Sequence, residues 1–228
     1  MEENTIQNIK DATVFLHRAK NTELHTDINE LMRYAGYSKQ GIADSEARFL
    51  EMAEDAAKKI GSIINCRAAY IRFPLEIHFD KDFKTNQNAK AVIKFGGITF
   101  ESRFLGINLE GCSAIYLFAA TLGPAVDKEI QKAAKINPAM SVFYQAAGAM
   151  YIESYCDFLQ NFLAENEQKN GFILKPRYSP GFGDVSLEFQ KTFFNLLQCQ
   201  KNLALTLNNS LIMSPEKSVT AFVGIKKK

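Results

Sequence analysis

Hydrophobic and polar positions follow two different periods along the chain. Between residues 45 and 64 the apolar residues recur every three or four positions, which predicts an amphipathic helix. From residue 71 to residue 79 every second residue is apolar, which predicts a strand with one buried face. Pro74 falls on the other face of that strand and indicates an edge or a bulge.

The middle of the chain predicts a hairpin, a buried strand and a long helix. Apolar and polar residues alternate in residues 91–95 and 98–100, on either side of Gly96-Gly97. This pattern is typical of a hairpin. Residues 113–121 form a continuous apolar run of strand length, so we expect both of its faces to be buried at the centre of a sheet. Residues 139–168 keep a helical period throughout.

Shorter elements are predicted towards both ends. The expected helices span residues 5–19, 27–35 and 187–199, and the expected strands span residues 203–207 and 219–223. Strands and helices come in clusters and do not alternate. This order favours an α+β fold with a largely antiparallel sheet.

Composition and charge exclude several function classes. The 228 residues are 46% hydrophobic and carry a net charge of +2 with acids and bases intermixed, so we expect neither nucleic-acid binding nor a membrane span. The start, MEENTIQNIKDA, does not resemble a signal peptide. The four cysteines and three histidines are too dispersed for a metal site. We therefore expect a cytoplasmic protein with reduced thiols and no bound metal.

One loop, KPRYSPGFGD at residues 175–184, is chemically unusual. Its two prolines each fix a φ angle, and its two glycines permit backbone conformations that other residues avoid. Arg177 adds a planar fork of donors that suits a carboxylate or a phosphate. Two interpretations stay open from the residues alone: a connector whose arginine is solvated or paired with an acid, and a rigid ligand-binding loop.

The loop and the segment after it resemble the activation domain of cobalamin-dependent methionine synthase. That family has an Arg-x-(Ala/Ser)-Pro-Gly-(Tyr/Phe) loop, which matches RYSPGF here, then a helix and a Leu-Thr-Glu-Ser-x-x-Met-x-Pro-x-x-Ser-Val-Ser segment. The residues that match the second segment are Ser210, Met213, Pro215, Ser218 and Val219. MRYAGY, at residues 32–37, resembles free-standing members. The resemblance covers roughly residues 30–225.

The resemblance implies a fold and a function. The fold is a C-shaped single α+β domain with a twisted, largely antiparallel sheet flanked by helices, over residues 39–228. The helical pattern before it adds the expectation that residues 1–38 form a helical segment packed on this body. The function is to bind S-adenosylmethionine and to support the reductive remethylation of cobalamin carried by a methionine synthase subunit. A flavodoxin-like donor supplies the electron. The chain is thus an accessory component and not a complete enzyme.

Site residues follow from the same resemblance. Arg177 matches the arginine that holds the methionine carboxylate, and Ser179 matches the residue whose backbone meets the adenosine. Pro180, Gly181 and Phe182 match the loop that shapes the ligand site.

Two further positions complete the expected site. Glu153 aligns with an acid on the long helix, where it either faces the ammonium or sulfonium charge or is solvated. Val223 falls at the first of two aromatic positions in the family's ligand site.

The chain also departs from the family pattern. Asn208 and Asn209 replace the Thr and Glu of the second motif, Val223 and Gly224 replace the aromatic pair, and we find no match for an N-terminal aspartate ligand. These departures favour an alternative, a module without a small ligand that caps a cobalamin protein. A further alternative, an activator of another corrinoid methyltransferase, would use the same surface with a different partner.

Overall fold

Five antiparallel strands form the main sheet of the computed structural model, which describes residues 13–43 and 47–228. Their spatial order is β1, β2, β6, β10 and β7. In that order their bounds are Phe15–Ala19, Cys66–Pro74, Cys112–Thr121, Ser218–Lys227 and Phe172–Leu174. The apolar run therefore lies on the central strand, as predicted, and residues 114–121 are all buried.

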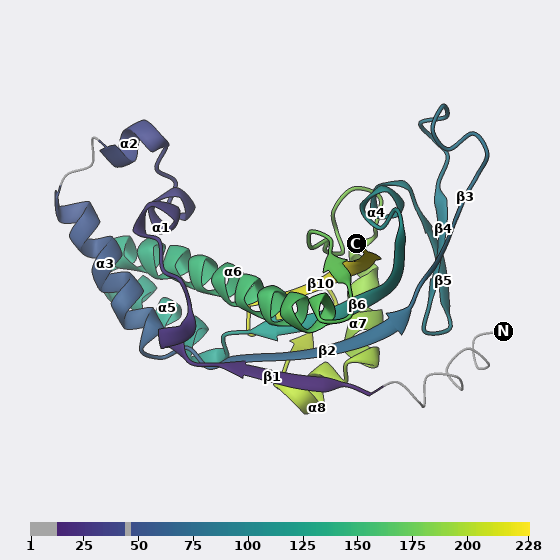
Figure 1. Ribbon diagram of the computed structural model, residues 1–228. Coiled ribbons are helices and arrows are strands. Elements are labelled where there is room, and N and C mark those ends of the chain that lie inside the picture. The colour runs from purple at the N-terminus through teal and green to yellow at the C-terminus, as the bar shows by residue number, and fades with distance from the viewer. Residues whose placement is uncertain (1–12, 44–46) are drawn as a thin grey trace.

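Helices cover one face of this sheet. The longest is α6, Pro138–Gln168, which begins where the Asn137 side chain accepts a hydrogen bond from the backbone N–H of Met140 at 3.2 Å. Its apolar side chains share a core with the sheet and with neighbouring helices. Figure 1 shows these helices around its N-terminal half. Those helices are α1 (Ile28–Tyr34), α3 (Ala47–Gly61) and α5 (Pro124–Ile136), and the short α2 (Lys39–Ala43) follows α1.

A second core lies on the other face of the sheet. It is rich in aromatic rings from several elements, and the ring of Phe222 on β10 lies 4.7 Å from that of Phe193. The elements on this side are the 3-10 turn η3 (Leu187–Phe189), α7 (Gln190–Leu196) and α8 (Cys199–Leu203). A separate three-stranded sheet, β3 (Glu76–Phe79), β4 (Ala91–Phe95) and β5 (Ile98–Ser102), leads into α4 (Arg103–Asn108).

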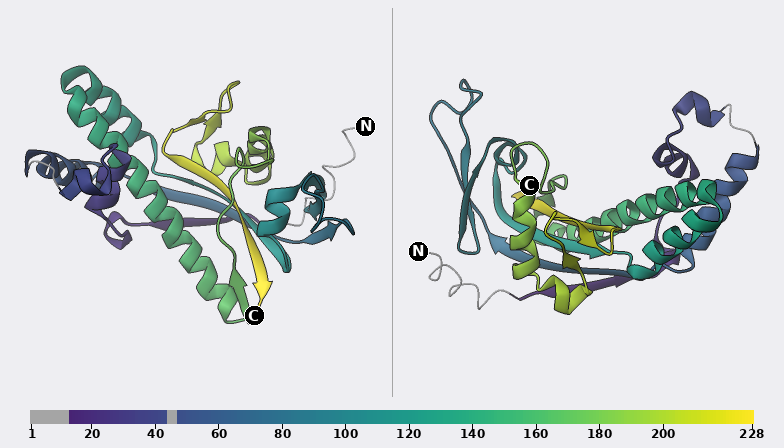
Figure 2. Two further views of the ribbon diagram at one scale, coloured as in Figure 1. Left: turned by 90° about the horizontal axis from the view of Figure 1, so that it is seen from above. Right: turned by 180° about the vertical axis from the view of Figure 1, so that it is seen from behind.

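The molecule has the open shape of a letter C. Figure 1 and the right-hand view of Figure 2 show the curled main sheet as the back of the C, with α1, α2 and α3 rising at one end and β3, β4 and β5 at the other. The predicted α+β class with a twisted antiparallel sheet is confirmed. The division between residues 1–38 and 39–228 stays a prediction.

The helix expected at residues 5–19 is wrong for residues 15–19. These residues form strand β1, which pairs with β2 at the edge of the sheet. Phe15 pairs with Tyr70, and their rings stack with centroids 5.4 Å apart. Pairing with an open sheet edge satisfies the backbone polar groups of both strands, which outweighs a weak helical pattern. The rest of that predicted helix, up to residue 12, lies outside the described residues.

Two other predicted elements are interrupted. The strand at residues 71–79 divides after Pro74 into β2 and β3, which belong to different sheets. The helix predicted at residues 187–199 begins as η3 and continues as α7. It is separated from α8 because Gln198 takes a left-handed conformation with φ of 48°. Helix α8 then extends to Leu203, so the strand predicted at residues 203–207 is reduced to Thr206–Leu207.

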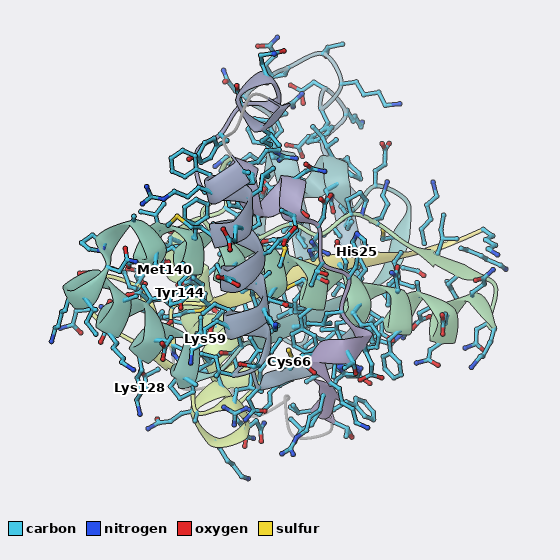
Figure 3. The ribbon with its side chains drawn as sticks, turned by 90° about the vertical axis from the view of Figure 1, so that its left-hand side faces the viewer. His25, Lys59, Cys66, Lys128, Met140 and Tyr144 are labelled. Atoms are coloured by element: carbon cyan, nitrogen blue, oxygen red, sulfur yellow. The ribbon has the colours of Figure 1, made fainter. Side chains whose placement is uncertain are left out.

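The packing of α3 on α6 leaves no room at Gly61. Figure 3 views this end of the molecule, where Lys59 on α3 also forms an ion pair with Glu129 on α5 at 3.7 Å. A Cβ atom at Gly61 would overlap the hydroxyl of Tyr151, which donates a hydrogen bond to the carbonyl of Ala57 at 3.0 Å.

We expect Gly61→Ala to lower the free energy of unfolding by about 1–3 kcal/mol, because overpacking forces the Tyr151 side chain to move. Urea denaturation measures this loss. Tyr151→Phe removes the clashing hydroxyl, so Gly61→Ala should cost less in that background. An equal cost in both backgrounds would contradict the assigned clash.

Within the described residues, no helix is both long enough and apolar enough to cross a membrane.

Candidate functional site

The proline- and glycine-containing loop is held against β10 by backbone hydrogen bonds. Tyr178 and Phe222 exchange both of theirs: the N–H of Tyr178 donates to the carbonyl of Phe222 at 3.0 Å, and the N–H of Phe222 donates back at 2.8 Å. The N–H of Lys175 donates to the carbonyl of Gly224 at 2.8 Å. The start of the loop is thus fixed to β10 of the main sheet.

The second half of the loop depends on glycine. Gly181 has φ of +91°, and its N–H donates to the carbonyl of Val185 at 2.9 Å. Gly183 has φ of +54°, and a Cβ atom there would overlap the hydroxyl of Tyr178. That hydroxyl donates to the carbonyl of Phe182 at 3.0 Å. These contacts give the loop one compact conformation.

Asp184 ties the end of the loop to α4. One carboxylate oxygen accepts from the hydroxyl of Ser102 at 2.5 Å, and the other accepts from the N–H of Arg103 at 2.7 Å. Burial acts to raise the pKa of Asp184, but the hydrogen bonds from Ser102 and from the backbone outweigh burial and lower it. The ionised carboxylate therefore stabilises both the helix start and the loop.

Asp184→Asn is expected to lower the free energy of unfolding by about 1 kcal/mol at pH 7, because an amide accepts these hydrogen bonds less well than a carboxylate. Since the folded pKa lies below the unfolded one, this contribution is complete above about pH 4 and disappears as the pH falls through the folded pKa. Urea denaturation at several pH values measures the difference. A difference that stays constant down to pH 2 would contradict this assignment.

Arg177 points from the loop to the exposed face of α6. Its Nη1 donates to Oδ1 of Asp157 at 2.5 Å and lies 3.4 Å from Oε1 of Gln160, and its Nη2 donates to Oε2 of Glu153 at 3.0 Å. Burial acts to lower the pKa of Arg177, but the hydrogen bond to Asp157 and the nearby carboxylates outweigh it and raise the pKa. The guanidinium is therefore firmly cationic, and its fork is occupied by two acids of the protein itself.

These residues border a cleft of about 650 Å³ between the loop and α6. The residues that give the cleft its chemistry are Glu153, Asp157, Gln160, Arg177, Ser179 and Phe182. Four positions expected from the sequence therefore come together, namely Arg177, Ser179, Phe182 and Glu153. Their placement brings a cation, one carboxylate, a serine and an aromatic ring around one hollow, and Asp157 adds a second carboxylate.

The other expected positions lie away from the surface of the cleft. Pro180 is buried and Gly181 is exposed outside the cleft lining, so both act on the shape of the loop. Val223 is fully buried in the core beneath α6. On the same face of β10, Val219 borders the cleft in its place.

Sequence reasoning missed Asp157 and Gln160. Both lie on the same face of α6 as Glu153, at spacings of four and seven residues. The sequence shows that spacing once residues 139–168 are taken as one helix. The sequence does not show which face of the helix the loop covers.

Glu153, which borders the cleft, also acts electrostatically on Tyr34 of α1. Burial, together with the carboxylates of Glu30 and Glu153, raises the pKa of Tyr34. The hydroxyl of Tyr34 donates to Glu30 at 3.3 Å, and its side chain is 41% exposed. The predicted helix at residues 27–35 thus brings an aromatic side chain near the acidic side of the cleft.

The charges of the cleft suit a ligand that carries both signs. One guanidinium and two carboxylates face the same hollow, so a ligand carboxylate would pair with Arg177 while a ligand cation would pair with Glu153 or Asp157. A purely anionic ligand would meet two like charges beside the arginine. The arrangement therefore favours a zwitterionic, amino-acid-like group.

Comparison with known proteins gives a structural likeness without a sequence match. No protein-family model matches the chain, and no curated protein matches it. Among solved structures, the crystal structure of the MetH reactivation domain bound to AdoHcy matches with a TM-score of 0.62 and 17% sequence identity. The match covers 93% of this chain and 78% of that chain. At this identity the likeness shows a shared fold, in agreement with the expected one.

Proposed function

We propose that this chain is a free-standing module that binds S-adenosylmethionine and supports the reductive remethylation of methionine synthase cobalamin in trans. The observation that carries the proposal is Arg177, held by a rigid loop in a cleft opposite Glu153 and Asp157. The shared fold adds support, because the MetH reactivation domain of the neighbouring structure is bound to AdoHcy.

On this proposal, each part of S-adenosylmethionine would have a counterpart in the cleft. Arg177 would take the carboxylate, and Glu153 or Asp157 would take the ammonium and face the sulfonium. Backbone groups at Ser179 and the ring of Phe182 would meet the adenosine. The volume of about 650 Å³ falls in the usual range for small-molecule sites, about 300–1,000 Å³.

The chain supplies binding and orientation, while its partners supply the remaining chemistry. Cobalamin carried by the methionine synthase subunit would supply the methyl-accepting chemistry, and a flavodoxin-like donor would supply the electron. The residues of this chain would hold the sulfonium in one orientation and exclude water around it. On this proposal the chain is an accessory of a methyltransferase.

Exposed apolar side chains around the loop support docking onto a partner. Phe182 is 67% exposed, Phe104 on α4 is 53% exposed and Leu187 is 39% exposed. Phe104 lies against Gly183, and Leu187 lies against Gly181. A grouped apolar surface beside a cleft is typical of an interaction site.

A second candidate is a module that caps a cobalamin protein without a small ligand. The hydrogen bonds of Arg177 favour it, because the two acids already occupy the guanidinium fork. An activator of another corrinoid methyltransferase would use the same surface with a different partner.

One experiment separates these functions. The chain is mixed with a separately expressed cobalamin domain of methionine synthase, and co-precipitation is measured with and without S-adenosylmethionine. The main proposal predicts capture that increases with S-adenosylmethionine, together with ligand retained by the chain alone in equilibrium dialysis. Capture independent of S-adenosylmethionine, without ligand retention, would establish the capping function instead. No capture under either condition contradicts both.

A further inference from the structure

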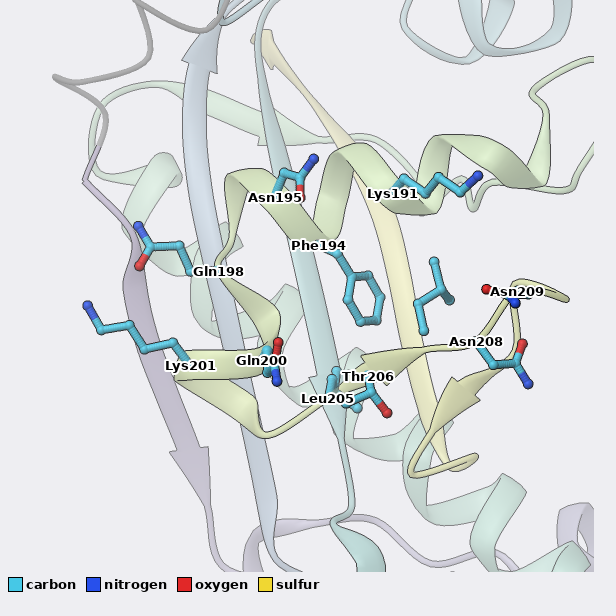
Figure 4. A pocket seen from close by; sticks show the side chains of 11 residues that line it. Lys191, Phe194, Asn195, Gln198, Gln200, Lys201, Leu205, Thr206, Asn208 and Asn209 are labelled. Atoms are coloured by element: carbon cyan, nitrogen blue, oxygen red, sulfur yellow. The ribbon is translucent and has the colours of Figure 1, made fainter.

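A larger cleft, of about 1100 Å³, lies elsewhere in the molecule, between α7, α8 and a small hairpin (Figure 4). The hairpin consists of β8 (Thr206–Leu207) and β9 (Met213–Ser214). No residue that borders the Arg177 cleft borders this one. It includes Asn208 and Asn209, the positions where the sequence departs from the methionine synthase pattern.

Strand β8 has an open edge on this cleft. In the described part of the chain its sheet contains only β8 and β9, with Leu207 opposite Met213. The N–H of Asn208 donates to the carbonyl of Ile212 at 3.1 Å, so Asn208 faces β9. Alternation in an antiparallel pair then turns the N–H and the carbonyl of Leu207 away from β9. These groups are available to another strand.

The opposite wall offers apolar and polar contacts. Figure 4 shows the ring of Phe194 pointing from α7 towards β8. The exposed side-chain amide of Gln200 borders the cleft from α8. An amide can donate and accept at once, as the backbone of an extended peptide requires.

The charged residues that border this cleft are both lysines. Lys191 and Lys201 stand at opposite ends of it (Figure 4), and no acid contributes to the lining. The ammonium group of Lys191 forms an ion pair with Glu188, which does not border the cleft. Lys201 forms no ion pair with any residue that the structure describes. The cleft therefore suits a ligand with negative charge near its ends.

We propose that this cleft binds an extended acidic peptide segment of a partner protein, which pairs as an added strand with the free edge of β8. Main-chain hydrogen bonds to Leu207 give the affinity, as in other cases of strand addition. The lysines select acidic side chains, and Phe194 packs against an apolar one. This site is independent of S-adenosylmethionine and of the Arg177 cleft.

The test uses fluorescein-labelled octapeptides and fluorescence anisotropy with the full chain. A peptide of alternating valine and glutamate is expected to bind saturably, and its valine–lysine counterpart is not. Methylation of every backbone nitrogen should abolish binding of the acidic peptide, because it removes the donors on both edges of the peptide that could pair with β8. Absence of saturable binding at millimolar peptide, or equal binding of the methylated peptide, overturns the proposal.

Lys201→Glu is expected to weaken the acidic peptide about ten-fold, since an attractive charge becomes a repulsive one. Lys132→Glu on α5 makes the same charge change away from the cleft and should leave binding unaltered. Amide chemical shifts should change at Leu207 and not in the Arg177 loop. Equal weakening by both variants would show only a general charge effect and would overturn the assignment.

Discussion

Arg177→Ala is expected to weaken S-adenosylmethionine binding roughly ten- to hundred-fold. The loss of a charge-assisted, two-point hydrogen bond to a carboxylate costs about 1.5–3 kcal/mol, which corresponds to that range of affinity. Removal of the arginine also leaves Glu153 and Asp157 without their cation, so a ligand carboxylate would meet only negative charge. Calorimetric titration of the wild type and the variant measures the effect.

Two control variants make this result specific. Arg177→Lys keeps the charge but loses the planar fork, so its affinity should fall between those of the wild type and the alanine variant. Arg48→Ala removes an exposed arginine from α3, outside the lining of the cleft, and should have no effect. An unchanged dissociation constant for Arg177→Ala would contradict the proposed role.

Phe222→Ala is expected to lower the free energy of unfolding by about 3–5 kcal/mol. The ring is fully buried between two groups of elements: it lies 4.7 Å from Phe193 on α7 and 6.0 Å from Phe95 on β4, centroid to centroid. Urea denaturation measures the change in stability. Because the backbone of Phe222 pairs with Tyr178, we also expect the Arg177 loop to become more susceptible to proteolysis.

Phe118→Ala is the matched control for this prediction. Phe118 is also fully buried, but its side chain lies in the other core, beneath α6. Phe118→Ala should lower the free energy of unfolding by a similar amount. It should not expose residues 175–184 to protease under native conditions. Equal loop cleavage in both variants would contradict a specific link between Phe222 and the loop.

The central part of the fold could be predicted because its patterns are strong and local. The apolar run at residues 113–121 requires burial on both faces, and the long helix at residues 139–168 repeats its period over many turns. The failures lie where non-local contacts decide. Residues 15–19 are a strand because β2 offers an edge, and the helix after Ser186 is interrupted by the left-handed conformation at Gln198.

The candidate site was partly predictable for the same reason. The loop sequence identified Arg177, Ser179 and Phe182 through their rigid neighbours. It did not indicate that Asp157 would share the guanidinium with Glu153, because this depends on how α6 is rotated beneath the loop. Val223 was aligned by position in a motif, and the alternation of β10 turns its side chain into the core.

The most direct test is a crystal structure of the chain grown with S-adenosylmethionine. We predict that the ligand carboxylate accepts hydrogen bonds from both terminal nitrogens of the Arg177 guanidinium. We also predict that Glu153 or Asp157 moves to the ammonium or sulfonium side of the ligand. A structure in which Arg177 still lies between the two acids, with no ligand density in the cleft at saturating concentration, would contradict the account.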